Sequence, residues 1–258
     1  MKKIIDKIVL IFSTFFLIRV GKVNNTKLLF SGLAHNTAEL ESFKVHGFYE
    51  RAMAERFERD AINSKIFFDI GGNIGNYNVL YNKVSNGLCY CWEPIRYFRF
   101  INIFNQIINS FSLKKFVLQD KFVGNFSDDK YQDLNDFCSK HNLYPDLVKL
   151  DAEGAESVIL PELKDKFFDN LTLYLEFHVP QIKYDFNQDP YKFLDFLFER
   201  FENIEFNRNH WGDFKGIPMG EWEDKKKHEI ALLIQDILDG NSIPRGFALI
   251  LSNNKIKT

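Results

Sequence analysis

Short apolar runs alternate with amphipathic stretches along most of this chain. Apolar runs that end in glycine, proline or an acid are typical of strands buried in a sheet, and the amphipathic stretches between them favour helices. The runs predict strands at 66–70, 88–92, 116–119, 147–150, 171–177, 204–206 and 247–251. The stretches predict helices at 47–63, 76–84, 97–108, 134–141, 155–163, 191–201 and 225–238.

This alternation indicates an α/β domain with a mostly parallel sheet, which we place at residues 46–258. In such sheets, ligands bind beyond the carboxyl ends of the strands. An acid lies at or just past the end of each of five predicted strands, namely Asp69, Glu93, Asp120, Asp151 and Glu176. We therefore expect a shared polar cleft at one edge of the sheet. Segment 121–131 is ambiguous and fits an irregular hairpin.

Composition narrows the class of protein. The chain has 258 residues, of which 16% are aromatic, and its net charge is −2. These values exclude disorder for most of the chain and give no general reason to bind nucleic acid. The three cysteines, Cys89, Cys91 and Cys138, form no disulfide framework. Cys89 and Cys91 would share one face of a strand and lie in the core, which indicates a reducing compartment.

Residues 1–45 are expected to form a basic, apolar helical extension. The apolar run 8–18 is shorter than the roughly 20 residues that a membrane-spanning helix needs, and no small-residue cleavage site follows it. Between Met1 and Ala38 there are six basic residues and a single acid, Asp6. Residues 1–22 could contact an anionic membrane surface as a peripheral segment. Alternatively, they form a helix that packs on the domain or on a partner chain.

The segment after the first predicted strand carries the most specific chemistry. It has the pattern D-x-G-x-x-x-G, with Asp69, Gly71 and Gly75. A nicotinamide oxidoreductase is disfavoured because the G-x-G-x-x-G pattern is not met. An acid two positions before the glycine suits a ligand that presents an ammonium group, such as S-adenosylmethionine, and Glu93 could accept hydrogen bonds from the ribose hydroxyls. An ordinary tight bend is the alternative. The predicted cofactor-binding residues are Asp69, Gly71, Gly72, Asn73, Gly75, Asn76, Glu93, Asp120 and Asp151.

Three segments together resemble the FkbM family of S-adenosylmethionine-dependent methyltransferases. They are D-I-G-G-N-I-G at 69–75, Glu93-Pro94, and V-K-L-D-A-E-G-A-E at 148–156. Tyr49-Glu50 and segment 173–178 also fit, so the resemblance covers about residues 45–180. It implies a class I (Rossmann-like), doubly wound methyltransferase fold with a seven-stranded sheet, and methyl transfer to a hydroxyl of a sugar or natural product. Asn135 departs from the aspartate that the family commonly has at this position.

Methyl transfer to a hydroxyl requires a group that removes a proton. The candidate catalytic residues are Asp151, Glu153, Glu176 and His178, with His178 as the leading base and Asp151 at the junction of cofactor and acceptor. The alternative for His178 is a loop histidine bonded to backbone, and for Glu153 it is compensation of a helix N-terminus. No ligand spacing is distinctive of a metal, so none is predicted, although several carboxylates converge.

Residues 207–246 fall where a substrate lid could lie. Trp211 and Trp222 could stack on a sugar or, alternatively, anchor the loop to the core. The leading function is an S-adenosylmethionine-dependent O-methyltransferase that acts on a sugar, glycan or related metabolite, with its active site in the cytosol. The alternative is a catalytically silent nucleoside-binding or scaffolding protein of the same fold.

Overall fold

The computed structural model describes residues 18–31, 43, 46–109, 113–209, 220–241 and 246–253. Its central element is an eight-stranded sheet in the order β11-β10-β12-β9-β8-β3-β4-β5. The strands are β3 (Ile66–Ile70), β4 (Leu88–Trp92), β5 (Phe116–Gln119), β8 (Leu147–Leu150), β9 (Thr172–Phe177), β10 (Asn203–Asn207), β11 (Glu223–Asp224) and β12 (Phe247–Ser252). The pairs among β9, β8, β3, β4 and β5 are parallel, whereas β12 runs antiparallel to both β9 and β10.

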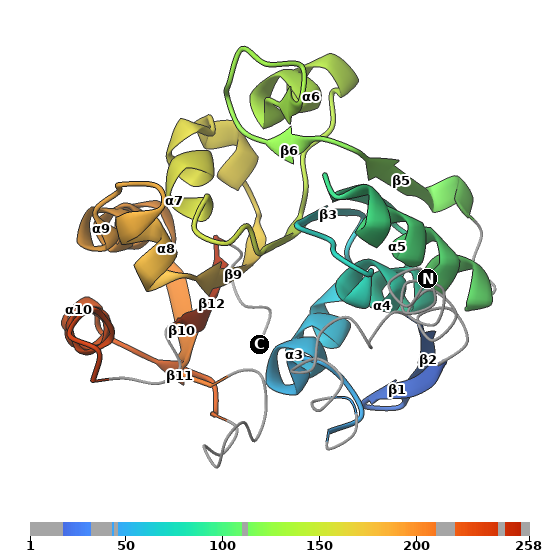
Figure 1. Ribbon diagram of the computed structural model, residues 1–258, viewed down its shortest axis with the longest axis horizontal. Coiled ribbons are helices and arrows are strands. Elements are labelled where there is room, and N and C mark those ends of the chain that lie inside the picture. Colours follow the sequence, from blue (N-terminus) through green and yellow to red (C-terminus); the bar gives the residue numbers. More distant parts are fainter. Residues whose placement is uncertain are drawn as a thin grey trace, which may run out of the picture.

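Helices cover both faces of the sheet (Figure 1). One face carries α3 (Arg51–Ala61), α4 (Asn76–Val84) and α5 (Arg96–Ile108). The other carries α6 (Leu134–His141), α7 (Glu156–Ile159), α8 (Val179–Tyr184), α9 (Pro190–Arg200) and α10 (Lys227–Leu238). Short 3₁₀ turns lie at Leu113–Lys115, Leu160–Glu162 and Asp165–Phe168. None of the helices in this described part of the chain has the length and apolar character needed to cross a bilayer.

The alternation of side chains along each strand explains the two cores. In β3, Phe67 packs with α3 and α4, while Phe68 points into the opposite layer with Trp92 and Phe137. Cys89 and Cys91 are both fully buried on the α3–α5 face, as the two-residue period predicts. The sheet is buried on both faces, which is why its strands appear in the sequence as continuous apolar runs.

The predicted fold class is confirmed. The sheet has the seven expected strands and a two-residue eighth strand, β11, at its edge. The first four predicted strands match the observed bounds without a shift, and the other three differ by one residue at one or both ends. Two sets of strands extend in opposite directions from β3 and β8, which is the doubly wound arrangement expected from the resemblance to class I methyltransferases.

The expected N-terminal helical segment is wrong for residues 19–30. They form an antiparallel hairpin of β1 (Arg19–Val23) and β2 (Thr26–Phe30), in which Val23 pairs with Thr26. Asn24 takes a left-handed conformation in the two-residue turn, with φ 44°. Val23, Leu28 and Phe30 alternate along the strands and are buried, so the local signal was an Asn-Asn turn between two alternating runs. The membrane-contact prediction covers residues 1–22, of which 1–17 lie outside the described residues, and it stays a prediction.

Two further segments differ from expectation. The sequence predicts an irregular hairpin at 121–131, but β6 (Phe122–Val123) pairs in parallel with β7 (Tyr131–Gln132). In the 207–246 excursion, Ile230, Ile234 and Ile237 of α10 belong to the core. The Nε1 atom of Trp222 donates a hydrogen bond to the carbonyl of Ala52 at 3.1 Å, so this tryptophan anchors its segment to α3. Trp211 lies outside the described residues, and the lid stays a prediction.

Candidate functional site

The glycine loop 71–75 lies at the point where the sheet changes winding direction, between the carboxyl ends of β3 and β8. Gly71 and Gly72 donate backbone hydrogen bonds to the carbonyl of Trp92, at 3.0 and 3.1 Å, which ties the loop to β4. Gly71 has φ 86°, and a Cβ there would stand 1.9 Å from the carbonyl oxygen of Asp151. Only glycine allows the loop to pass this close to the end of β8, so the loop and Asp151 are adjacent.

Asp69 is buried beneath this loop, with 2% of its surface exposed. Its Oδ2 atom accepts a hydrogen bond from Nδ2 of Asn78 at 2.8 Å. Burial raises the pKa of the Asp69 carboxyl to about 7, against the opposing effects of Lys149 and Asn78. A carboxyl group in this state gains from any cation that approaches it, because the cation would stabilise its ionised form.

Glu93 fastens the loop from the end of β4. Its Oε2 accepts from the backbone N–H of Asn73, and its Oε1 accepts from that of Ile95, both at 2.8 Å. Burial raises the pKa of Glu93, while these two backbone donors act in the opposite direction. Each carboxylate oxygen keeps a second lone pair for a ligand hydroxyl. The structure therefore brings Glu93 to the loop, as predicted, and adds a structural role that the sequence did not show.

Three amide oxygens around the loop are buried without a hydrogen bond in the described structure. They belong to Asn73, Asn76 and Asn102. Asn73 has φ 43°, and Asn102 uses its Nδ2 to hold the carbonyl of Asn73 at 3.2 Å. Buried acceptors without donors are uncommon and indicate a site that a donor-bearing ligand or water completes. Asp120, which follows β5 at the same edge of the sheet, is exposed and lies next in sequence to Gln119, whose carbonyl accepts from the N–H of Glu93 at 3.1 Å.

A buried lysine organises the carboxylates at the ends of β8 and β9. Lys149 is 2% exposed, and its Nζ lies 2.6 Å from Oε1 of Glu176, 3.6 Å from Oδ2 of Asp151 and 3.8 Å from Oε2 of Glu50. Burial alone would lower the pKa of Lys149, but these carboxylates hold it above its usual value. Tyr77 donates to Oε2 of Glu50 at 2.6 Å. The roles of Lys149, Glu50 and Tyr77 were missed, although a lysine inside the apolar run Leu147–Leu150 was a visible signal.

His178 faces this group from the end of β9. Its Nδ1 lies 3.0 Å from Oε1 of Glu156, a fully buried carboxylate that also accepts from the N–H of Ala152 at 2.9 Å. Its Nε2 faces Asp151, Glu176 and Glu153, at 3.7, 3.8 and 3.9 Å. Burial would lower the pKa of His178, but Glu156 and the other carboxylates raise it to about 10. The bonding of His178 to backbone, considered as its alternative, is thus replaced by bonding to Glu156.

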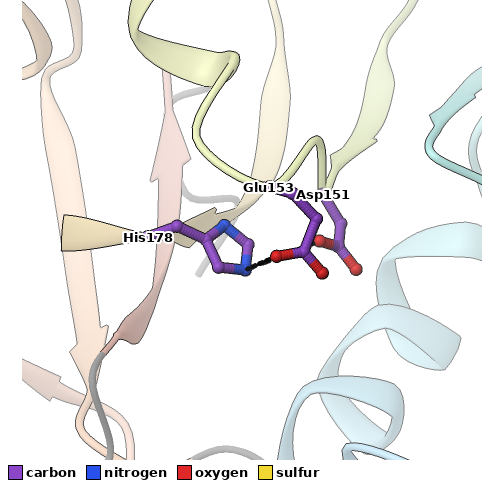
Figure 2. A group of neighbouring side chains, drawn as sticks. All are labelled: Asp151, Glu153 and His178. Carbon is purple, nitrogen blue, oxygen red and sulfur yellow. Dashed lines mark ion pairs between the residues drawn. The ribbon is translucent and has the colours of Figure 1, made fainter. Parts of the chain in front are cut away.

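The loop after β8 turns two of these acids toward His178. Glu153 has φ 50° and Gly154 has φ 101°, where a Cβ would stand 2.6 Å from Cβ of Gln181. Figure 2 shows the carboxylates of Asp151 and Glu153 side by side, with the ring of His178 pointing at them. Burial and Glu176 hold the pKa of Asp151 well above its usual value, while Lys149 and His178 oppose the shift. Asp151, Glu153, Glu176 and His178, all proposed from sequence, therefore do come together.

Two groups of these side chains have the spacing of metal ligands: Asp151, Glu153 and His178, and Glu50, Asp151 and Glu176. In the second group, the ammonium of Lys149 already lies 2.6–3.8 Å from all three carboxylates, in the place that an ion would take.

Asn135, the departure from the family pattern, has a structural role. Its Nδ2 donates to the carbonyl of Glu162, and its Oδ1 accepts from the N–H of Lys164, both at 2.9 Å. Asp133 caps α6 by accepting from the N–H of Asn135 at 2.7 Å. Asn135 therefore gives no support to the alternative of a catalytically silent protein.

Comparisons with known proteins were made for the whole chain. No family model matches it, and no curated protein matches it, so the resemblance to the FkbM family rests on the quoted motifs. Among solved structures, a putative O-methyltransferase from Klebsiella pneumoniae is similar with a TM-score of 0.45 and 10% identity, over 84% of this chain and 88% of that one. TYW2 of M. jannaschii, in complex with AdoMet, gives a TM-score of 0.44 and 13% identity, over 91% of this chain and 84% of that one. Precorrin-6y C5,15-methyltransferase from Geobacter metallireducens gives a TM-score of 0.43 and 11% identity, over 79% of this chain and 89% of that one. Similarities of this size carry no conclusion about activity.

Proposed function

We propose that this protein is an S-adenosylmethionine-dependent O-methyltransferase whose acceptor is a hydroxyl of a sugar, glycan or related metabolite. The observation that carries the proposal is the contact between the glycine loop and the end of β8, where Gly71 leaves no room for a side chain beside Asp151. A cofactor held by the loop would lie next to His178 and a cluster of five acids, Glu50, Asp151, Glu153, Glu156 and Glu176. The choice of a hydroxyl acceptor rests on the resemblance to the FkbM family.

The residues of the loop fit this cofactor. The unsatisfied amide oxygens of Asn73 and Asn76 are acceptors for a ligand that donates. Asp69 would hold the ammonium group, Glu93 the ribose hydroxyls and Asp120 the adenine amino group. When bound, the cofactor supplies a methyl group on a sulfonium, which is electrophilic without help from the protein. The task left to this chain is to orient the acceptor and remove its proton.

Asp151 is the better-placed group to take that proton. It is adjacent to the loop, its side chain is 29% exposed, and its pKa is held well above its usual value. His178, with its pKa raised to about 10, carries a proton at neutral pH and would stabilise the carboxylates instead. Lys149 holds Glu176 in place and keeps the surrounding acids from repelling one another. This division of roles revises the expectation that His178 is the base.

The experiment is incubation with methyl-labelled cofactor and fractionated glycans, lipids and small metabolites. We expect label in a carbohydrate-containing fraction with the wild-type protein, and none with Asp151→Asn, which should still bind S-adenosylhomocysteine. Asp185→Asn, the same change at an exposed position on the surface, should label as the wild type does. Cofactor binding without label in any fraction would contradict the proposed activity. Label in the lipid or amine fraction would contradict the proposed acceptor.

A further inference from the structure

The strongest unexplained feature of the site is the Nε2 atom of His178. It faces Oδ1 of Asp151 at 3.7 Å, Oε2 of Glu176 at 3.8 Å and Oε2 of Glu153 at 3.9 Å, and the Glu176 carboxylate is already bonded to Lys149 through Oε1. These distances are too long for hydrogen bonds. They are close to the separation of two ligands that share one ion, because ligands about 2.1 Å from a metal at a tetrahedral angle lie about 3.4 Å apart. The ligand atoms of Asp151, Glu153 and His178 all lie within 4.8 Å of one another.

The other ring nitrogen of His178 is already fixed. Nδ1 lies 3.0 Å from Oε1 of Glu156, whose side chain is fully buried. A histidine that binds a metal commonly donates its second N–H to a carboxylate, which fixes the tautomer and leaves the first nitrogen free to coordinate. Glu156 would therefore belong to the outer shell of a metal site, and His178 and the facing acids would supply its inner ligands.

The charges at the site also favour a bound cation. The described side chains here include the carboxylates of Glu50, Asp151, Glu153, Glu156 and Glu176, against the fixed cation Lys149 and the ring of His178, whose Nε2 proton a bound metal ion would displace. The second oxygen of Glu156, Oε2, is buried without a hydrogen bond in the described structure. A buried, unpartnered carboxylate oxygen is costly, and it indicates that a positive charge is missing nearby.

We propose that Asp151, Glu153 and His178 form a binding site for one divalent first-row transition-metal cation, with Glu156 orienting His178. Two oxygens and one imidazole nitrogen suit Mn²⁺, Fe²⁺, Co²⁺ or Zn²⁺ better than Mg²⁺, which prefers oxygen ligands only. The side chain of Glu153 is 77% exposed, so the outer side of the site is open to water or to an acceptor. No spacing along the chain predicts this site, because its ligands follow two different strands.

The location connects the cation to the proposed function, on which this part of the inference rests. Asp151 is adjacent to the glycine loop, so the ion would lie between the cofactor and the acceptor. It would bind the acceptor oxygen and lower the pKa of the hydroxyl, whose proton would pass to water on the open side of the site, so that Asp151 would serve as a ligand of the ion and not as the base. An acceptor with two neighbouring oxygens, such as a vicinal diol of a sugar, would be the best ligand for its open positions.

The test uses Mn²⁺ as the probe, with free Mn²⁺ followed by electron paramagnetic resonance on the full chain. We expect one equivalent of Mn²⁺ to bind. Glu153→Gln should weaken binding at least tenfold, and because Glu153 is exposed, this variant should fold normally. His178→Ala should weaken it by a similar or larger factor. Glu156→Gln, which changes only the outer shell, should weaken it about 10- to 100-fold. Glu162→Gln, the same change at an exposed acid outside the site, should have no effect.

Two results would overturn the proposal. One is no binding of Mn²⁺, Co²⁺ or Zn²⁺ at millimolar concentration, which would make His178 a protonated partner of the carboxylates. The other is binding that Glu153→Gln and His178→Ala leave unchanged. The affinity for S-adenosylhomocysteine, measured with a chelator present, separates this inference from the proposed function. Metal binding without nucleoside binding would contradict the methyltransferase, and nucleoside binding without metal would contradict this site alone.

Discussion

Replacement of Asp69 by asparagine tests the physical interpretation of the cofactor loop, because it should raise stability and weaken cofactor binding together. The pKa of Asp69 is displaced from 3.8 to about 7 by burial. The ionised form is therefore unfavourable in the folded protein. A displacement of this size corresponds to about 4 kcal/mol of unfolding free energy at a pH above 7. The amide of the Asp69→Asn variant would keep an acceptor for Asn78 without that cost.

The pH dependence has a definite sign. The folded-state pKa of Asp69 is raised, so its contribution to stability is fully present below the unfolded pKa near 3.8 and is lost as the pH rises through about 7. Asp69→Asn should therefore stabilise the ligand-free protein by up to about 4 kcal/mol at pH 8, and by about half of that or less at pH 5. Urea denaturation at both pH values measures the difference.

The affinity for the cofactor should rise with pH, whereas the contribution of Asp69 to stability falls. If the ligand ammonium pairs with ionised Asp69, the affinity of the wild type for S-adenosylhomocysteine should rise about tenfold from pH 6 to pH 8. Calorimetry should show this dependence in the wild type, and weak, pH-independent binding in Asp69→Asn. A variant that is less stable than the wild type at pH 8, or that binds with unchanged affinity, would refute the reasoning.

Three other substitutions test the scaffold of the site. Glu93→Gln places a donor opposite a backbone N–H of the loop, so calorimetry should show at least tenfold weaker binding of S-adenosylhomocysteine. Gly71→Ala should lower the unfolding free energy by about 2–3 kcal/mol, because its Cβ meets Asp151; Gly240→Ala, also at positive φ but in open space, is the control in the same melts. Lys149→Met should lower the unfolding free energy by about 3–5 kcal/mol in urea denaturation, since it leaves three carboxylates without their cation. A loss under about 1 kcal/mol would contradict the proposed role of Lys149.

The elements of the sheet could be predicted from sequence because their signal is local. Strands buried on both faces are continuous apolar runs. Pairs such as Phe67-Phe68 and Leu147-Val148 therefore predict a strand in the interior of the sheet, where both side chains are buried. The hairpin at 19–30 was not predicted, because the apolar run 8–18 and the basic residues around it favour a helix and were taken to represent all of residues 1–45. The antiparallel insertion of β12 between β9 and β10 is a long-range pairing that no local pattern shows.

The candidate site was predictable in part, for a related reason. Acids at strand ends and the glycine spacing are local signals, and they predict Asp69, Glu93 and Asp151 as site residues. The bonding of His178 to Glu156 depends on two segments 22 residues apart meeting at one edge of the sheet. This contact raises the pKa of His178 and changes its expected role, and it could be seen only in three dimensions.

A crystal structure of the protein grown with S-adenosylhomocysteine tests the central claim most directly. We expect density for the nucleoside against the loop 71–75, with its amino group beside Asp69, its ribose at Glu93 and its sulfur facing Asp151. Density at another position, or a loop left without density at saturating ligand, would contradict the account.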